Sequence, residues 1–154
     1  MVTVLCAILA AGIFVLDLLL KNQIESRLEE GEVKPFCRGR LLLKKYHNKG
    51  AFLDLGAKKQ GMIAGLSLLL TLFMTVVFLS TFTFRGNAAL KAGLAFLLGG
   101  AYSNTYDRLG RKYVVDYASF PVKNPRISRI VFNISDFCIL IGAVLITVSQ
   151  LRNT

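Results

Sequence analysis

Two aspartates in or beside apolar sequence are the residues best suited to catalysis. Asp136 lies in the run ISDFCIL, and Asp116 lies in the run VVDY. An ionisable side chain inside a membrane span costs about 3 kcal/mol on insertion scales, so it persists mainly where it has a function. Two carboxylates that face each other share a proton, because both cannot ionise cheaply. One can then activate a water as general base while its protonated partner polarises a carbonyl, which is the chemistry of an aspartic peptidase.

Further polar residues gather at the same ends of the apolar segments. They end the first and third segments and open the fourth, and they are Asp17, Lys21, Asn104, Asp107, Arg108 and Asn133. The opposite ends carry little that is polar apart from Arg85 and Lys91. Random solvation of helix ends would not be so one-sided, so the sequence predicts one polar site at one membrane face.

Each of these residues also has a purely structural explanation. Asp17 and Lys21, at i and i+4, could form only a helix-end ion pair. Asp107 could be solvated at the membrane interface, Asn133 could simply cap a helix, and Asp116 could be an ordinary loop residue. Asp136 within its apolar run is the hardest to explain in this way, and its coincidence with a second aspartate strengthens both assignments.

The remaining sequence offers little for other hydrolytic chemistry. The sole histidine, His47, cannot build a His-based metal site, and no Cys/His cluster exists. The cysteines are odd in number and two lie in apolar segments, so we expect no disulfide framework. A Ser–Lys dyad stays open, although no serine of the polar cluster adjoins a basic residue. We therefore expect neither a metal nor another cofactor.

Four apolar blocks must position these side chains. A helix rising ~1.5 Å per residue needs roughly 20 residues to cross ~30 Å of hydrocarbon. We expect transmembrane helices at about residues 2–21, 62–84, 88–106 and 130–151. A buried soluble core is the alternative, but the uncharged run 62–84 is too long and uniform for it. The first block lacks the basic n-region and small-residue cleavage site of a signal peptide, so we expect it to remain in the mature protein.

The connections between these blocks are expected to form two long loops on one side, at 22–61 and 107–129, within a single domain of residues 1–154. Residues 22–32 read as a helical extension of the first span. Short apolar stretches at 40–46 and 51–55 surround Asn48-Lys49-Gly50, which suggests a small β element on the membrane surface. Residues 113–120 alternate weakly and could pair with it.

Basic residues dominate the loops and give the chain a net charge of +10. In a membrane protein such loops more often contact anionic lipid headgroups than nucleic acid. No aromatic-interleaved basic motif or zinc spacing supports nucleic-acid binding. The first long loop together with Lys21 carries ten Lys and Arg residues, and the second carries six. Counted alone, these charges would place both long loops in the cytoplasm.

Five blocks, taken in order, resemble lipoprotein signal peptidase (signal peptidase II). They are Asp17-x-x-x-Lys21, His47-Asn48-Lys49-Gly50-Ala51-Phe52, the run from Gly99 to Arg108, Val114-Val115-Asp116-Tyr117, and Phe132-Asn133-Ile134-Ser135-Asp136. Each block is weak alone, but the ordered set is specific and extends over most of the chain. The resemblance implies an all-α membrane protein, with four transmembrane helices and a small extracytoplasmic β cradle.

The resemblance also implies an activity and a setting. The family removes signal peptides from diacylglyceryl-modified prolipoproteins, cutting just before the lipidated cysteine. It works in the bacterial cytoplasmic (inner) membrane, with cytoplasmic termini and an active site near the outer leaflet. The family's catalytic pair corresponds to Asp116 and Asp136. Its supporting residues correspond to Asp17, Lys21, Asn48, Gly50, Asn104, Asp107, Arg108 and Asn133. The expected partners are lipidated prolipoproteins and membrane lipids, with the enzyme acting as a monomer.

The chain departs from the family pattern at four positions. Ser103 and Ser135 replace the usual Gly and Ala, and Lys112 replaces the usual glycine before the Val-Val-Asp segment. Phe52 arrives one position early in the first-loop motif. A divergent but active peptidase is the favoured interpretation. A catalytically silent paralogue that binds lipidated peptides, and a small transporter that uses the aspartates for ion passage, are the alternatives.

Overall fold

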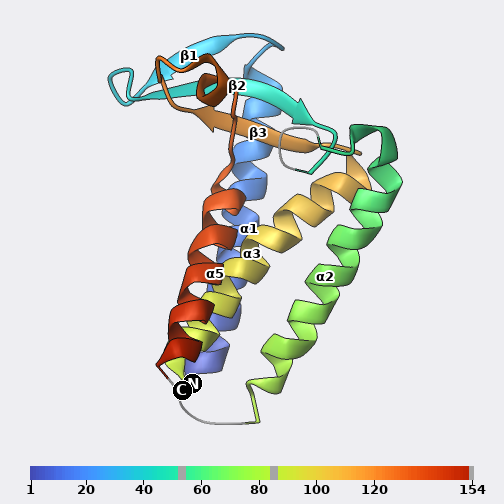
Figure 1. The fold of residues 1–154 in the computed structure, drawn as a ribbon, viewed down its shortest axis with the longest axis vertical. Coiled ribbons are helices and arrows are strands. Elements are labelled where there is room, and N and C mark those ends of the chain that lie inside the picture. Colours follow the sequence, from blue (N-terminus) through green and yellow to red (C-terminus); the bar gives the residue numbers. More distant parts are fainter. Residues whose placement is uncertain (52–54, 84–86, 153–154) are drawn as a thin grey trace.

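The computed structural model describes residues 1–51, 55–83 and 87–152. Four long helices run along the molecule, and a three-stranded sheet lies across one end of them (Figure 1). The two chain ends lie at the opposite end, as Figure 1 shows. The long connections thus share one end of the molecule and the termini the other, while the assignment of these ends to two sides of a membrane stays a prediction.

The long helices are α1 (Val2–Arg27), α2 (Gln60–Ser80), α3 (Ala88–Gly110) and α5 (Ile134–Leu151). Helix α1 continues past the predicted span, as expected for 22–32, but it ends at Arg27. A short 3-10 turn, η2 (Ala57–Lys59), precedes α2. Helix α5 begins at Ile134 rather than at residue 130, and position 84 of the second predicted span lies outside the described residues.

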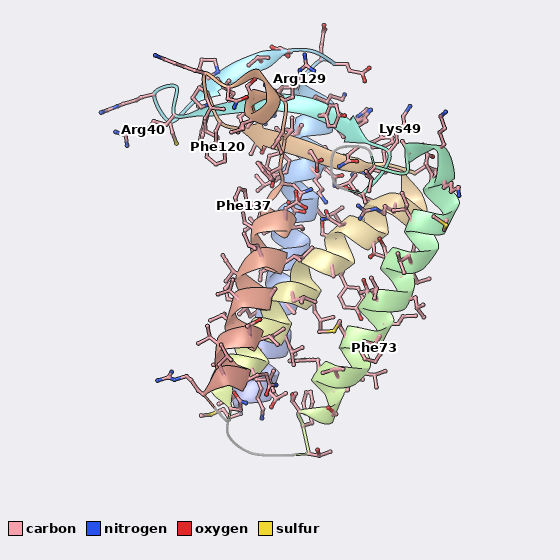
Figure 2. All side chains as sticks on the ribbon, viewed as in Figure 1. Arg40, Lys49, Phe73, Phe120, Arg129 and Phe137 are labelled. Carbon is pink, nitrogen blue, oxygen red and sulfur yellow. The ribbon has the colours of Figure 1, made fainter. Side chains whose placement is uncertain are left out.

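Within the described ranges, three helical segments are long and apolar enough to cross a membrane: Val2–Arg27, Ala57–Ser80 and Ile134–Leu151. Large apolar side chains on these segments are exposed, among them Ile8, Leu140 and Phe73, the last labelled in Figure 2. Helix α3 is as long but fails the same test, because its second half carries glycines and polar residues. It packs against α1, α2 and α5, which bury about half of its residues, while Tyr102, Tyr106 and Leu109 stay exposed. A fourth span at α3 stays a prediction.

Two adjacent glycines let α3 approach both of its main neighbours. A Cβ at Gly99 would lie 2.7 Å from the Ile13 Cβ of α1, and one at Gly100 would lie 2.4 Å from the Ser135 carbonyl oxygen of α5. Small residues at such contacts are the usual means of close helix packing in membranes. The same stretch of α3 leads into the polar residues that end the helix.

The sheet has the order β1-β2-β3, with both pairs antiparallel. Its strands are β1 (Val33–Phe36), β2 (Leu41–Asn48) and β3 (Val114–Ser119). The expected β element near 40–46 and its pairing with 113–120 are confirmed. The sequence analysis did not identify β1 or the short helix α4 (Pro125–Ser128).

One irregularity in β2 decides which side chains reach β3. Leu43 pairs with Ala118, but Tyr46 pairs with Asp116, so one extra residue is accommodated between Leu43 and Tyr46. Paired residues in an antiparallel sheet point to the same face, and side chains alternate along a strand. The bulge therefore places Asn48 on the same face of the sheet as Asp116. If the register between Leu43 and Ala118 continued unchanged along the strand, Asn48 would point to the opposite face.

The segment before α5 is tied to β3. Phe132 forms an isolated bridge with Ala118, in which the Phe132 N–H donates to the Ala118 carbonyl oxygen at 2.8 Å. The N–H groups of Tyr117 and Ala118 in turn donate to the Phe132 carbonyl oxygen. The start of α5 is thereby fixed beside the strand that carries Asp116.

Candidate active site

Asp116 is buried in the middle of β3, with 3% of its surface exposed. Its Oδ2 accepts a hydrogen bond from Asn48 Nδ2 at 3.0 Å, and its Oδ1 accepts one from Asn133 Nδ2 at 2.7 Å. Burial and the negative charge of Asp136 raise the pKa of Asp116 to about 7, against the lowering effect of the two amide hydrogen bonds. Asp116 is thus poised to exchange a proton near neutral pH.

Asp136 lies in the first turn of α5, where it takes part in a reciprocal cap with Asn133. The Asp136 N–H donates to Asn133 Oδ1 at 2.9 Å, and the Asn133 N–H donates to Asp136 Oδ2 at 3.0 Å. This capping box satisfies two N–H groups that the helix cannot, and it fixes the carboxyl group. The other oxygen, Oδ1, accepts from Asn104 Nδ2 of α3 at 3.0 Å.

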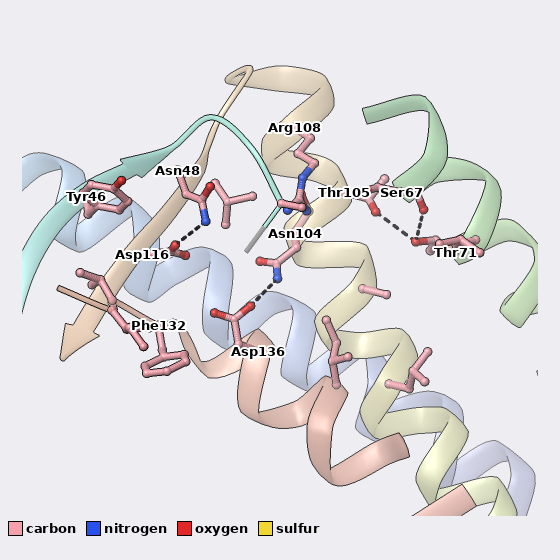
Figure 3. Close-up of a pocket in the computed structure, with 18 of the residues that line it drawn as sticks. Tyr46, Asn48, Ser67, Thr71, Asn104, Thr105, Arg108, Asp116, Phe132 and Asp136 are labelled. Carbon is pink, nitrogen blue, oxygen red and sulfur yellow. Dashed lines mark hydrogen bonds between the residues drawn. The ribbon is translucent and has the colours of Figure 1, made fainter. Parts of the chain in front are cut away.

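Asn133 joins the two aspartates. Its amide oxygen accepts from the Asp136 backbone, while its amide nitrogen donates to Asp116. Asn133 does cap the fourth helix, as its purely structural explanation required, and the cap is at the same time a bridge to the second carboxylate. The two aspartates come from a strand and a helix, and Figure 3 shows both at one wall of a pocket.

That pocket is a cavity of about 590 Å³ which the two carboxyl groups share with a largely apolar lining. The apolar part of its lining includes Leu70 and Met74 of α2, Leu97 of α3 and Ile139 of α5. A cavity with apolar walls and a few convergent polar groups is the usual form of a ligand site.

Beneath the aspartates, the Lys21 ammonium group occupies a polar cluster with no solvent exposure. It lies 2.9 Å from Asp17 Oδ2 and 3.0 Å from Asp107 Oδ2, and it donates to Ser103 Oγ at 3.0 Å and to Asn104 Oδ1 at 2.9 Å. A buried charge of this kind is stable only when it is paired and hydrogen-bonded. The interpretation of Asp17 and Lys21 as a helix-end ion pair alone is therefore wrong, because their contacts extend into α3.

Comparison with known proteins identifies the family to which the chain belongs. The model of the family Signal peptidase (SPase) II matches residues 9–152. The chain belongs to the signal peptidase II family. Curated relatives include a lipoprotein signal peptidase of Cupriavidus pinatubonensis, 32% identical over 91% of this chain and 78% of the relative. One from Moorella thermoacetica is 28% identical over 90% of this chain and 87% of the relative.

Solved structures show the same fold. One bacterial membrane enzyme superposes with a TM-score of 0.83 at 21% identity, covering 96% of this chain and 88% of its own. A second superposes with a TM-score of 0.82, covering 97% and 94%. Family membership and the three apolar helices together indicate a bacterial membrane protein.

In this signal peptidase II member, the first-loop motif contacts the third helix. Asn48 Oδ1 accepts from the Gly50 N–H at 3.1 Å, which orients the amide so that its nitrogen faces Asp116. The Gly50 carbonyl oxygen and the Asn104 carbonyl oxygen each accept from Arg108, both at 3.3 Å. Asp107 Oδ2 accepts from the Val115 N–H at 3.1 Å, which holds β3 against the end of α3. All ten residues identified in the sequence thus converge on one region.

The structure shows the surroundings of three of the four residues that depart from the family pattern. Ser103 and Ser135 are fully buried, and both donate to Asp17 Oδ2, at 2.7 and 2.5 Å. Lys112 has a φ of 71°, a left-handed conformation that favours glycine. Phe52 lies outside the described residues.

Sequence reasoning missed Tyr117. Its hydroxyl donates to Asp17 Oδ1 at 2.8 Å and accepts from the Ile134 N–H at 3.1 Å, so it joins α1 to the start of α5. One feature of the sequence could have identified Tyr117 as part of the site. It follows Asp116 in a short apolar strand, and a buried tyrosine hydroxyl needs a hydrogen-bond partner.

Proposed function

We propose that this chain is an aspartic endopeptidase that removes the signal peptide from diacylglyceryl-modified prolipoproteins, cutting just before the lipidated cysteine. Asp116 and Asp136 are the catalytic pair. The observation that carries the proposal is that these two carboxyl groups line one cavity and are bridged by Asn133. The substrate class follows from the lipoprotein signal peptidases to which the chain is similar.

The proposed reaction uses one proton shared by the pair. The ionised carboxylate takes a proton from a water molecule, whose oxygen attacks the scissile carbonyl carbon. The protonated carboxyl group gives its proton to the carbonyl oxygen, and the departing amine then receives a proton from the pair. A pKa of Asp116 raised to about 7 by burial and by Asp136 is consistent with one shared proton at neutral pH.

The polar residues around the pair hold it in position. Each oxygen of Asp116 and Asp136 accepts one N–H donor, from Asn48, Asn133, Asn104 and the backbone of residue 133. Such donors keep the carboxyl planes fixed without supplying another acid or base of similar pKa. The apolar part of the cavity suits a lipidated chain segment, because burial of apolar surface there needs no directional contacts.

The proposed setting is the cytoplasmic (inner) membrane, with the sheet and the active site near its outer leaflet and the enzyme acting as a monomer. Helix α3 would be the fourth span, shielded by α1, α2 and α5. This shielding would explain how a segment with Lys91, Asn104 and Asp107 could cross: all three are buried against protein.

Cleavage of a diacylglyceryl-modified prolipoprotein by the purified protein in detergent is the direct test. Asp116→Asn and Asp136→Asn should each lower kcat by at least about a thousandfold, because an amide neither takes a proton from water nor returns one. The double variant should be no slower than the slower single variant, since the two groups act as a unit. Glu30→Gln, at a carboxylate whose side chain is 79% exposed, is the matched control and should leave the rate unchanged.

Turnover by either aspartate variant near the wild-type rate would refute the aspartic mechanism. A wild-type protein that binds the lipidated peptide but never cleaves it would instead identify the silent paralogue.

A further inference from the structure

Asp17 is the point at which four separate elements are joined by side-chain contacts. Its carboxylate, on α1, accepts from Ser103 of α3, Ser135 of α5 and Tyr117 of β3. Its fourth contact is Lys21, one turn along α1. Asp17 has no solvent exposure, so these contacts alone stabilise its charge.

Hydroxyl groups are needed here because the cations are already shared. The Lys21 ammonium lies between Asp17 and Asp107, at 2.9 and 3.0 Å. One buried cation cannot fully compensate two carboxylates, and the ion pair that Arg111 forms is with Asp107, at 3.3 Å from Oδ1, whereas Lys21 faces Oδ2. The three hydroxyl groups donate hydrogen bonds that stabilise the part of the Asp17 charge that the shared Lys21 ammonium does not compensate.

Each of the two serines directly precedes a residue that belongs to the pair's hydrogen-bond network. Ser135 is followed by Asp136, and Ser103 is followed by Asn104, which donates to Asp136 Oδ1. Successive helical residues point about 100° apart around the axis. A serine fixed on Asp17 therefore sets the rotation of its helix, and with it the direction of the next side chain.

The contacts of Lys21 and Tyr117 also fix the orientation of residues around Asp136. Lys21, which only donates, contacts Asn104 Oδ1 and so turns the Asn104 amide nitrogen toward Asp136. The Tyr117 hydroxyl accepts from the N–H of Ile134, the first residue of α5. The start of α5 is held by the Asn133 cap on one side and by the Asp17 cluster on the other.

We infer that Ser103, Ser135 and Tyr117 are positioning residues, whose hydroxyl groups hold Asp17 so that Asp136 and Asn104 keep their reactive orientation. The inference rests on the proposed peptidase function. It assigns a purpose to the two positions at which serine replaces the Gly and Ala expected from the family resemblance. None of the three hydroxyls needs to contact the substrate.

The test uses Ser103→Ala, Ser135→Ala and Tyr117→Phe in the full-length protein, each of which removes only a hydroxyl group. Ser149→Ala is the matched control, because Ser149 is a buried α5 serine whose hydroxyl donates to Asn87 Oδ1 at 3.0 Å, far along the helix from Asp136. The measurements are kcat and KM for a lipidated prolipoprotein in detergent, and the midpoint of thermal unfolding.

Each of the three variants should lower kcat by about tenfold to a hundredfold, the range expected when a catalytic group loses its alignment. KM should stay within about twofold, since the apolar cavity wall is unchanged. Because both serines donate to the same Asp17 oxygen, the Ser103→Ala/Ser135→Ala double variant should lose less than the product of the single losses. Ser149→Ala should keep the wild-type kcat, whatever its change in thermal midpoint.

A kcat within about twofold of wild type in all three variants would overturn the inference, as would an equal fall in Ser149→Ala. If a serine variant does not fold, Tyr117→Phe on the opposite oxygen of Asp17 decides the question alone. An inactive wild-type protein, or an active Asp136→Asn variant, would refute the peptidase proposal and is thus a separate result.

Discussion

Asp116→Asn should make the protein more resistant to unfolding at alkaline pH while abolishing cleavage. The ordinary pKa of an aspartate is 3.8, and burial together with the charge of Asp136 raises that of Asp116 to about 7. A raised pKa means that the folded protein binds this proton more tightly than the unfolded chain does. Ionised Asp116 therefore opposes folding above pH 7, and the penalty disappears as the pH falls toward 3.8.

The size of the effect follows from the two pKa values. At 1.36 kcal/mol per tenfold change in proton affinity, the interval from 3.8 to about 7 corresponds to a penalty of about 4 kcal/mol above pH 7. At pH 5 about 2 kcal/mol of this remains, so the penalty grows by about 2–3 kcal/mol between pH 5 and pH 8.

An asparagine at position 116 does not ionise, so it carries no such penalty, but it loses one of the two hydrogen bonds that Asp116 accepts. Both oxygens of Asp116 accept from amide nitrogens, those of Asn48 and Asn133, so the new NH₂ group must face one of these donors. The lost hydrogen bond costs about 1–3 kcal/mol at every pH. The net stabilisation at pH 8 is then about 1–3 kcal/mol, and its dependence on pH is the more distinctive signal.

Thermal unfolding in detergent at pH 5 and pH 8 measures this difference. The midpoint of the variant minus that of wild type should be about 5–10 °C more positive at pH 8 than at pH 5, taking ~2–4 °C per kcal/mol. Glu30→Gln should show no such trend. An equal difference at both pH values for Asp116→Asn would refute the reasoning, because Asp116 would then titrate at its ordinary pKa.

Three further predictions follow from other parts of the molecule. Gly100→Ala should lower stability by about 1–3 kcal/mol, since its Cβ would meet the Ser135 carbonyl oxygen at 2.4 Å; an unchanged thermal midpoint would contradict this packing. Lys112→Gly should raise the midpoint, by relieving a left-handed conformation worth about 1 kcal/mol; a lower midpoint would count against it. Exposed Cys37, in the turn between β1 and β2, should react with a membrane-impermeant maleimide in intact cells. In a Cys37→Ser background, Gly86→Cys should be protected, and the reverse pattern would show that the basic loops face the cytoplasm.

The sequence was sufficient to predict the four long helices, strands β2 and β3 and the gathering of polar residues at one end of the helices, but not how these parts contact one another. Asp136 could be identified because a carboxylate in an apolar run is costly, and Asp116 because it matched Asp136 in setting. The orientation of Asn48 could not be predicted, since it depends on a bulge that no residue type in β2 signals. Strand β1 was missed because its residues Val33–Phe36 are all exposed and show no alternation.

The serines show a second limit. From the sequence, Ser103 and Ser135 could be identified only as departures from the family pattern that adjoin Asn104 and Asp136. Their shared contact with Asp17 forms only when α1, α3 and α5 pack together. Helix α3 shows a third, because its glycines and polar residues lower its apolar content, and the span expected at 88–106 stays a prediction although the helix itself forms.

The bulge in β2 absorbs a change of length that the residues after it would not. The side chains of Lys44 and Lys45, which lie between Leu43 and Tyr46, bond to the backbone oxygens of Ser128 and Glu25 and to the Glu25 carboxylate. Many replacements there should be tolerated. Loss of one of these two residues would leave a regular ladder in which Asn48 still pairs with Val114. Loss of His47, which follows the bulge, would in contrast pair Asn48 with Val115 and turn it to the other face of the sheet, leaving Asp116 without one of its two amide donors. Among natural relatives, positions 44 and 45 should therefore vary in residue type and number, whereas the spacing between Tyr46 and Asn48 should stay constant.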